Sequence, residues 1–435
     1  MGKEHLRILL TDAVASIIRL AKECGIGLEL PTENYIVSWF EQTSPTHESS
    51  REETRSEPRF QNLERHFLET IQSDERVIAF KREALRFAEK YHPGKFWSPF
   101  WSPERTVNSL VVIYFNQVKS LKIDSSEIER LCSEYIDDLK SSDASVLTIY
   151  RIEDLSAPTA FALKNGINFR PVNEKDIDKY CRENPLRRTQ WPCLNKKDWI
   201  LEIECSGPKE TTKTFNDHGA ISEHIINALR LSTSGRAIFT LLSNSYKSPF
   251  LNFGEAHGGN FVATSRSPGK VQLEAKDLER FRQLYSAICL VETNPSLKDL
   301  RLPLRRLHIS SSRTDAEDHL VDVVIGLERL LASDTKTGEI GFRFRLRGAA
   351  LLSDSFGSVA ERIDLMNKFY SLRSNVVHGD IKESIANEYA PRAEEALKEI
   401  VRWYLSRIDT FSNLKKIMKE LDEQCAVGAY NWAHP

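Results

Sequence analysis

The spacing of the apolar residues changes twice along this chain of 435 residues, from helical to alternating and back to helical. Up to about residue 136 the spacing is mostly helical, as at Leu10, Val14 and Ile17. Because the two periods suit different backbone structures, we expect a multidomain α and α+β protein. The predicted parts are an N-terminal helical region at 1–143, a central α+β domain at 144–300 and a C-terminal four-helix bundle at 301–425.

Alternation predicts strands in the central region, at 146–152, 159–172, 199–205 and 237–242. The dipeptide Asn165-Gly166 lies inside the second of these segments and predicts a tight hairpin turn. Helices are expected between the strands, at 221–231 and 276–290. In the N-terminal region, residues 43–58 lack apolar side chains and mix turn formers with charge, so we expect a mobile loop there.

Four amphipathic helices are expected after Pro303, at about 320–331, 342–352, 359–377 and 390–408. The first has a continuous apolar stripe made of Leu320, Val323, Val324, Leu327 and Leu331. Because the links between these helices are short, an up-and-down bundle is predicted.

The charge balance limits the kinds of partner. The chain has 60 Lys and Arg against 62 Asp and Glu, so a polyanion would have to bind locally. No apolar run approaches the roughly 20 residues that span a bilayer, and Glu4 and Asp12 lie where a secretory signal would be apolar. We therefore expect a cytoplasmic protein with no membrane partner. Its seven scattered cysteines are expected to be reduced.

The strongest candidate for chemistry is the end of the third bundle helix, FYSLRSNVVHGD at 369–380. Gly379 is a natural helix cap, so His378 is expected in the final turn, where the carbonyl end favours a protonated imidazole suited to proton transfer. Arg373 offers a forked cation for a phosphate. Five residues correspond to about 140° of helix rotation, so the two residues do not share a face. A second copy around a two-fold axis would bring them together.

The segment LRSNVVHGD resembles the R-x4-H signature of HEPN domains (higher eukaryotes and prokaryotes nucleotide-binding), and especially their Apea-like branch. EDHLVDVVIGLERLL and FRLRGAALL are similar to the first two helices of that branch. The resemblance covers about 302–408 and implies a four-helix bundle, usually dimeric. Many active members of the family are metal-independent endoribonucleases in toxin–antitoxin, abortive-infection and CRISPR defence.

The resemblance implies that Arg373 stabilises the charged phosphorane while His378 moves protons as a ribose 2′-OH attacks the neighbouring phosphate. The products would be a 2′,3′-cyclic phosphate and a 5′-OH, and the substrate would have to be RNA. Ser374 and Asn375 would support the site, although many family nucleases have Asn, Asp or His directly after the arginine. The expected function is antiphage or stress defence, without cofactor, in a homodimer whose N-terminal region could bind a trigger or regulatory protein. The alternative is a non-catalytic HEPN scaffold or a nucleotide- or RNA-binding module.

Glu328 lies at the margin of the first bundle helix's apolar stripe, where a carboxylate needs a cation. Arg345, Arg347 or Arg373 could pair with it. The pairing could be purely structural, or it could hold Arg373 in place.

Two basic segments could contact RNA. The loop at 184–199 combines Arg187, Arg188, Lys196 and Lys197 with Trp191 and Trp199, which could bind single-stranded RNA by charge and stacking. Arg305 and Arg306, with Arg301 and Arg313, form a second cluster. Ordinary exposed segments have similar compositions. No metal site is expected, because Asp217, His218, His224 and His257 lack a recognised ligand spacing.

Overall fold

The chain divides into two compact units. A computed structural model describes residues 2–23, 70–91, 103–118, 121–164, 166–178, 194–208, 213–233, 235, 237–248, 250, 260–261, 270–333, 339–378, 383–408 and 414–426. The first unit comprises Met1–Leu147, Glu204–Asn216 and Ser243–Ala256, and the second comprises Thr148–Ile203, Asp217–Leu242 and His257–Pro435. The predicted boundary at 143–144 lies close to one of these divisions. The predicted boundary at 300–301 falls inside the second unit.

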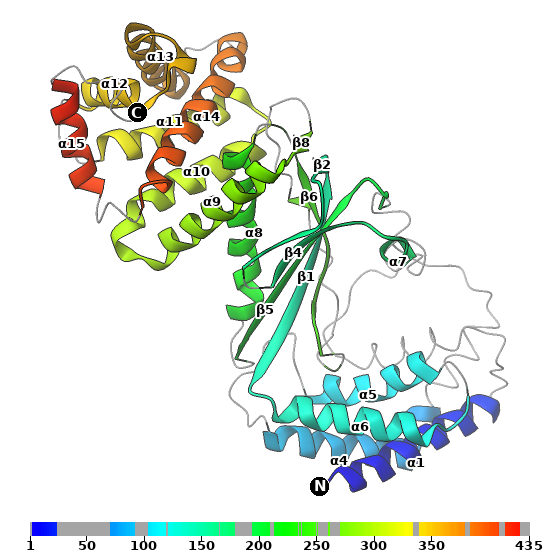
Figure 1. Ribbon diagram of the computed structural model, residues 1–435. Helices are drawn as coiled ribbons and strands as arrows, with labels where there is room; N and C mark the ends of the chain where they lie inside the picture. Colours follow the sequence, from blue (N-terminus) through cyan, green and yellow to red (C-terminus); the bar gives the residue numbers. More distant parts are fainter. Residues whose placement is uncertain are drawn as a thin grey trace. The chain divides into compact units, whose positions relative to one another are not determined.

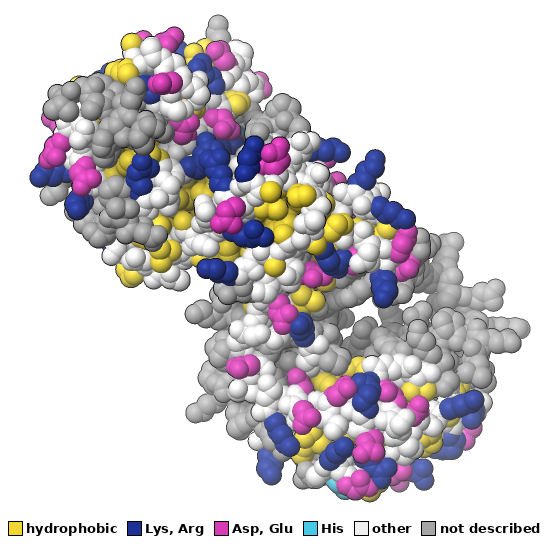
Figure 2. All heavy atoms as spheres, in the orientation of Figure 1, with side chains coloured by type: hydrophobic (Ala, Val, Ile, Leu, Met, Phe, Trp, Pro, Cys, Tyr) yellow, Lys and Arg dark blue, Asp and Glu magenta, His cyan; other side chains and the backbone are white. Residues whose placement is uncertain are grey.

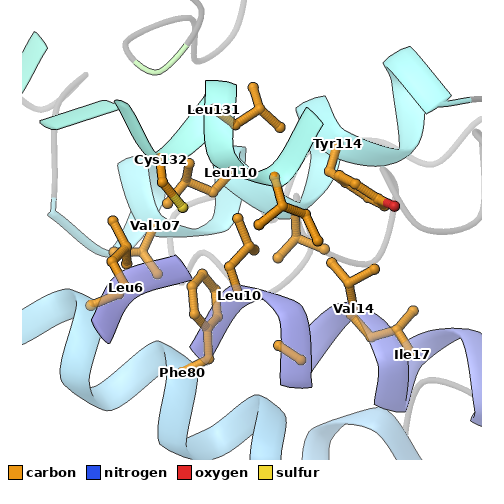
Figure 3. Close-up of a cluster of buried hydrophobic side chains, with 14 of the residues drawn as sticks. Leu6, Leu10, Val14, Ile17, Phe80, Val107, Leu110, Tyr114, Leu131 and Cys132 are labelled. Atoms are coloured by element: carbon orange, nitrogen blue, oxygen red, sulfur yellow. The ribbon is translucent and has the colours of Figure 1, made fainter. Parts of the chain in front are cut away.

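Helices build most of the described part of the first unit (Figure 1): α1 (Lys3–Glu23), α4 (Glu75–Tyr91), α5 (Pro103–Val118) and α6 (Ser125–Lys140). α1 packs on α4 and α6, and α5 packs on the same two helices. Leu6, Leu10 and Val14 of α1 are fully buried in the resulting core with Phe80 and Leu131 (Figure 3). The helical spacing seen in the sequence thus reflects one shared core. The loop predicted at 43–58 lies outside the described residues.

The described strands of the alternating region form a six-stranded sheet in the order β3-β4-β5-β1-β6-β7. They are β1 (Asp143–Glu153), β3 (Phe161–Leu163), β4 (Ile167–Pro171), β5 (Trp199–Pro208), β6 (Ile238–Tyr246) and β7 (Asn260–Phe261). β3 and β4 pair antiparallel with Leu163 opposite Ile167, which confirms the predicted hairpin. Gly166 has a φ of 71° in the turn, a conformation that glycine adopts without strain. Two short strands, β2 (Leu155–Ser156) and β8 (Val271–Gln272), pair parallel.

The second unit contains most of the remaining helices: α8 (Lys213–Ser232), α9 (Ala275–Thr293), α10 (Arg301–Ser312), α11 (Ala316–Ala332), α12 (Ile340–Leu351), α13 (Val359–His378), α14 (Glu383–Leu405) and α15 (Leu414–Ala426). α9 packs on the β3-β4 hairpin, where the Phe281 ring lies edge-on to Phe161 and Phe169. None of the described helices has both the length and the apolarity that crossing a bilayer requires.

Helices α11 to α14 form a bundle in which each helix packs on the other three. The predicted stripe of α11 is its core: Leu320, Val323, Val324, Leu327 and Leu331 are fully buried. Gly348 of α12 permits a close approach to α13, because a Cβ there would overlap the terminal methyl of Met366. α10 packs on α11 and α14, and α15 packs on α12. The bundle therefore has additional helices beyond the four predicted.

A buried cluster of charges connects α8 with the bundle. Glu394 of α14 accepts from Arg230 of α8 at 2.6 Å and from Lys398 at 2.9 Å. His319 Nε2 of α11 lies 2.9 Å from the same carboxylate. Asn227 of α8 also donates to the Leu304 carbonyl at 3.2 Å. These contacts explain why the bundle and the segment before it belong to one unit.

Candidate functional site

Helix α13 carries both residues of the R-x4-H pattern near its C-terminal end. Its buried face packs on α11, α12 and α14 and includes Leu365, Met366, Phe369 and Leu372. The Arg373 side chain is 37% exposed. His378 is the last residue of the helix and is exposed. Solvent therefore reaches both members of the predicted pair.

The predicted supporting residues Ser374 and Asn375 follow Arg373 on the same turn. Ser374 is half-buried and Asn375 is exposed. Val377 is also 62% exposed, although it is apolar. The last turn of α13 thus presents small polar groups, an imidazole and an apolar side chain at the surface. Gly379, the predicted helix cap, lies outside the described residues.

Glu328 of α11 is the carboxylate nearest to Arg373, among the described residues. Its Oε2 lies 4.0 Å from Arg373 Nη2, which is ion-pair range but too long for a hydrogen bond. Burial raises the pKa of Glu328, and the charge of Arg373 opposes this effect. Arg373 Nε is buried and has no hydrogen-bond partner among the described residues. Arg373 thus lies in charge range of Glu328 without a hydrogen bond to it, and its partly exposed side chain reaches solvent through the guanidinium end rather than through Nε.

Arg347 and Arg345, the other two cations considered for Glu328, have different partners. Arg347 is fully buried, forms a two-pronged pair with Asp422 of α15 at 2.7 Å, and donates to the Leu331 carbonyl at 2.6 Å. Arg345 donates to Asn367 at 3.1 Å. The supporting role expected for Arg347 is therefore corrected: this residue joins α15 to α12.

The basic cluster before the bundle is largely paired within the protein. Arg306 and Arg313 both contact Asp322, a carboxylate with a 3% exposed side chain, at 2.5 and 2.8 Å. Arg301 lies 3.5 Å from Glu292. Arg305 is exposed. Of the two arginines proposed to contact RNA here, Arg306 has a structural role and Arg305 is the one at the surface.

The second basic segment is described only in part. Arg187, Arg188 and Trp191 lie outside the described residues. Lys196 pairs with Glu174 at 2.5 Å, and Lys197 is exposed. Trp199 is 6% exposed, and its ring lies 6.2 Å from that of Phe161. It begins β5 and belongs to the core, so it offers no stacking surface for a base.

The described residues contain no group of three or more His, Cys, Asp or Glu side chains that could hold a metal ion. His224 is half-buried on α8, and burial lowers its pKa against the opposing charge of Glu292. The side chains of Asp217 and His218 are not among those described, and His257 lies outside the described residues.

Sequence reasoning missed a group of arginines on α9 and at the end of α14. Arg280, Arg402 and Arg407 line one cavity together with Trp403. The segment RWYLSR at 402–407 is the only local signal, and it falls within the amphipathic helix expected at 390–408. The partner on α9 lies more than a hundred residues earlier, so no local pattern connects the two.

Comparisons with protein-family models, with curated proteins and with solved structures found no match for the chain.

Proposed function

We propose that this chain is a metal-independent endoribonuclease of the HEPN type, which acts in antiphage or stress defence as a homodimer. Arg373 and His378 carry the chemistry. The observation that supports this most is the state of Arg373, whose side chain is 37% exposed and whose Nη2 lies 4.0 Å from Glu328 Oε2, too far for a hydrogen bond. An arginine in that state can bind a phosphate without first breaking a hydrogen-bonded pair.

The proposed reaction begins with the 2′-OH of the substrate. An imidazole accepts its proton as O2′ bonds to phosphorus, and the bond from phosphorus to O5′ breaks as that oxygen takes up a proton. Arg373 binds the non-bridging oxygens, whose negative charge grows in the transition state. The products are a 2′,3′-cyclic phosphate and a 5′-OH. DNA is not a substrate, because it has no 2′-OH.

Two copies are needed to assemble this site. On one ideal helix the Arg373 and His378 side chains point about 140° apart. In a two-fold dimer the matching helix ends would supply two guanidiniums and two imidazoles to one cleft, so that one imidazole acts as base and the other as acid.

Exposed apolar side chains are available for such an interface. Phe342 of α12 is 55% exposed and Val377 of α13 is 62% exposed. A Cβ at Gly341 would lie 3.5 Å from the ring of Tyr370, so the start of α12 lies beside the last turns of α13. Val377 is thus on the helix end that carries Arg373 and His378, and Phe342 is at the start of the neighbouring helix α12. A second copy bound there would cover both apolar side chains.

The test is expression of the wild type beside Arg373→Ala and His378→Ala, with Lys368→Ala as the matched control. Lys368 is an exposed cation on the same helix. We expect the wild type and the control to stop growth and to produce RNA fragments ending in 2′,3′-cyclic phosphate under triggering conditions. The two site variants should do neither while remaining folded. Intact RNA in all four strains would favour the non-catalytic scaffold instead.

A further inference from the structure

A cavity of about 560 Å³ lies between α9, the end of α12 and the end of α14, away from the residues proposed for catalysis. Arg280 and Leu284 line it from α9, and Arg402 and Trp403 line it from α14. Arg407 lies just after α14 and completes the wall. Its volume is in the range that holds a mononucleotide-sized molecule and is too small for a folded partner.

The cavity has an excess of positive charge. Three arginines line it against one carboxylate, Glu399, which accepts the backbone N–H of Ser353. Arg402 donates to the Leu231 carbonyl at 3.4 Å. Burial lowers the pKa of Arg402 and the like charge of Arg280 lowers it further, while the charges of Glu395 and Glu399 oppose both effects. Like charges in a half-buried cavity are unfavourable unless an anion lies between them.

The opposite part of the cavity is flat and apolar. Trp403 is 4% exposed and offers no stacking surface itself, but its ring supports the half-buried Arg407, whose guanidinium carbon lies 4.6 Å from the ring centre. Leu284, Ala287 and Leu405 add apolar surface. Guanidinium planes are surfaces on which planar rings stack. Figure 2 shows dark-blue basic side chains beside yellow apolar ones over the region where Figure 1 places α9, α10 and α14.

We infer that this cavity binds a free nucleotide, with its phosphates between Arg280 and Arg402 and its planar base on the guanidinium plane of Arg407, which the Trp403 ring supports. The cavity has a pair of cations on one part of its lining and a planar, largely apolar wall on another. A phosphorylated planar molecule would contact both parts, whereas a simple anion would contact only the cations. The inference does not depend on the ribonuclease proposal, because it uses other residues and requires no catalysis.

The test is equilibrium binding of ATP, AMP, adenosine and inorganic pyrophosphate to the full chain by calorimetry. ATP should bind more tightly than AMP, pyrophosphate should bind more weakly than ATP, and adenosine should bind least. Arg280→Glu and Arg402→Ala should each weaken ATP binding by about tenfold or more, the effect of losing one charge-assisted contact. Arg282→Ala is the matched control, since Arg282 lies on α9, is exposed and is not among the lining residues.

Circular dichroism establishes that each variant is folded, and Arg280 is exposed, so its replacement should leave the fold intact. The inference is overturned if the wild type binds none of the four probes below about 1 mM. It is also overturned if the Arg280→Glu and Arg282→Ala variants bind ATP equally well. Binding of a single-stranded RNA oligonucleotide without any binding of ATP would replace the free nucleotide with a nucleic-acid partner.

Discussion

Glu328 Oε2 and Arg373 Nη2 lie 4.0 Å apart, on α11 and α13. Burial raises the pKa of this carboxylate although the guanidinium faces it, so the charged form of Glu328 is not fully compensated in the fold. Such a pair places Arg373 without hydrogen-bonding it. We therefore expect the charge of Glu328 to lower the free energy of unfolding at neutral pH. By orienting Arg373, the same charge should increase RNA cleavage.

Glu328→Gln should separate those two effects. A carboxyl whose pKa is raised on folding contributes stability below its unfolded pKa, and that stability is lost as the pH rises through the folded value. At neutral pH the variant should therefore be as stable as the wild type or more stable, by up to about 1 kcal/mol. RNA cleavage should fall about tenfold, because Arg373 loses its orienting charge. Chemical denaturation at pH 4 and pH 7 and a cleavage assay measure the two effects. Lower stability at pH 7 with unchanged cleavage would contradict the positioning role.

Glu394→Gln should be among the most destabilising single changes in the second unit. Burial alone would raise the pKa of Glu394, but the charges of Arg230 and Lys398 and the contact with His319 Nε2 hold it well below its usual range. Removing the charge leaves the buried Arg230 without a carboxylate partner, although Lys398 keeps Glu395 at 2.8 Å, and this costs about 3–5 kcal/mol. Urea denaturation measures this loss. Glu388→Gln, an exposed glutamate on the same helix, should change the free energy of unfolding by less than about 0.5 kcal/mol.

The same carboxylate predicts an acid limit for the fold. A group with a depressed folded pKa contributes stability above its unfolded pKa of about 4.5. That stability is lost as the pH falls through the lower, folded value. The wild type should therefore lose stability between pH 5 and its acid unfolding more steeply than Glu394→Gln does, as thermal denaturation at several pH values would show. Parallel pH profiles would mean that the cluster does not titrate with folding.

Arg347→Met should release α15 and leave the proposed RNA cleavage unchanged. Arg347 is fully buried between Asp422 and the Leu331 carbonyl, so the variant loses charge-assisted hydrogen bonds worth about 1.5–3 kcal/mol each. Asp422 is 41% exposed and can be solvated after the change. Hydrogen exchange should rise in α15 while RNA cleavage is kept. If RNA cleavage is lost while hydrogen exchange in α15 stays slow, Arg347 has a role in the catalytic site.

The sequence predicted best what depends on local pattern. The α11 stripe, the β3-β4 hairpin at Gly166 and the strands around 146–152 and 199–205 follow from the spacing of neighbouring residues. Exposure of Arg373 and His378 at the end of α13 also agrees with their expected place on the helix. The sequence did not predict which residues from distant parts of the chain contact one another. Periodicity could not show that Arg347 pairs with Asp422, or that Trp199 is a core residue.

Long-range pairs explain the rest of the differences. Arg230 and Glu394 are 164 positions apart in the sequence, yet they form one buried cluster that joins α8 to the bundle. For this reason a domain boundary placed where the pattern changes, at 300–301, falls inside a compact unit. Arg280 and Arg402 are also far apart in the sequence, although they line one cavity. Each looks like an ordinary surface cation on its own helix.

Mixing two inactive variants tests the central proposal most directly. Purified Arg373→Ala and His378→Ala proteins are each expected to leave a single-stranded RNA intact. When they are mixed and allowed to exchange subunits, the mixed dimer has one Arg373 and one His378. The single imidazole then acts as the base and water must protonate O5′, so cleavage ending in 2′,3′-cyclic phosphate should return in part. Mixed dimers that form, as native mass spectrometry would show, and still do not cleave the RNA cleaved by the wild type would contradict a site shared between two copies.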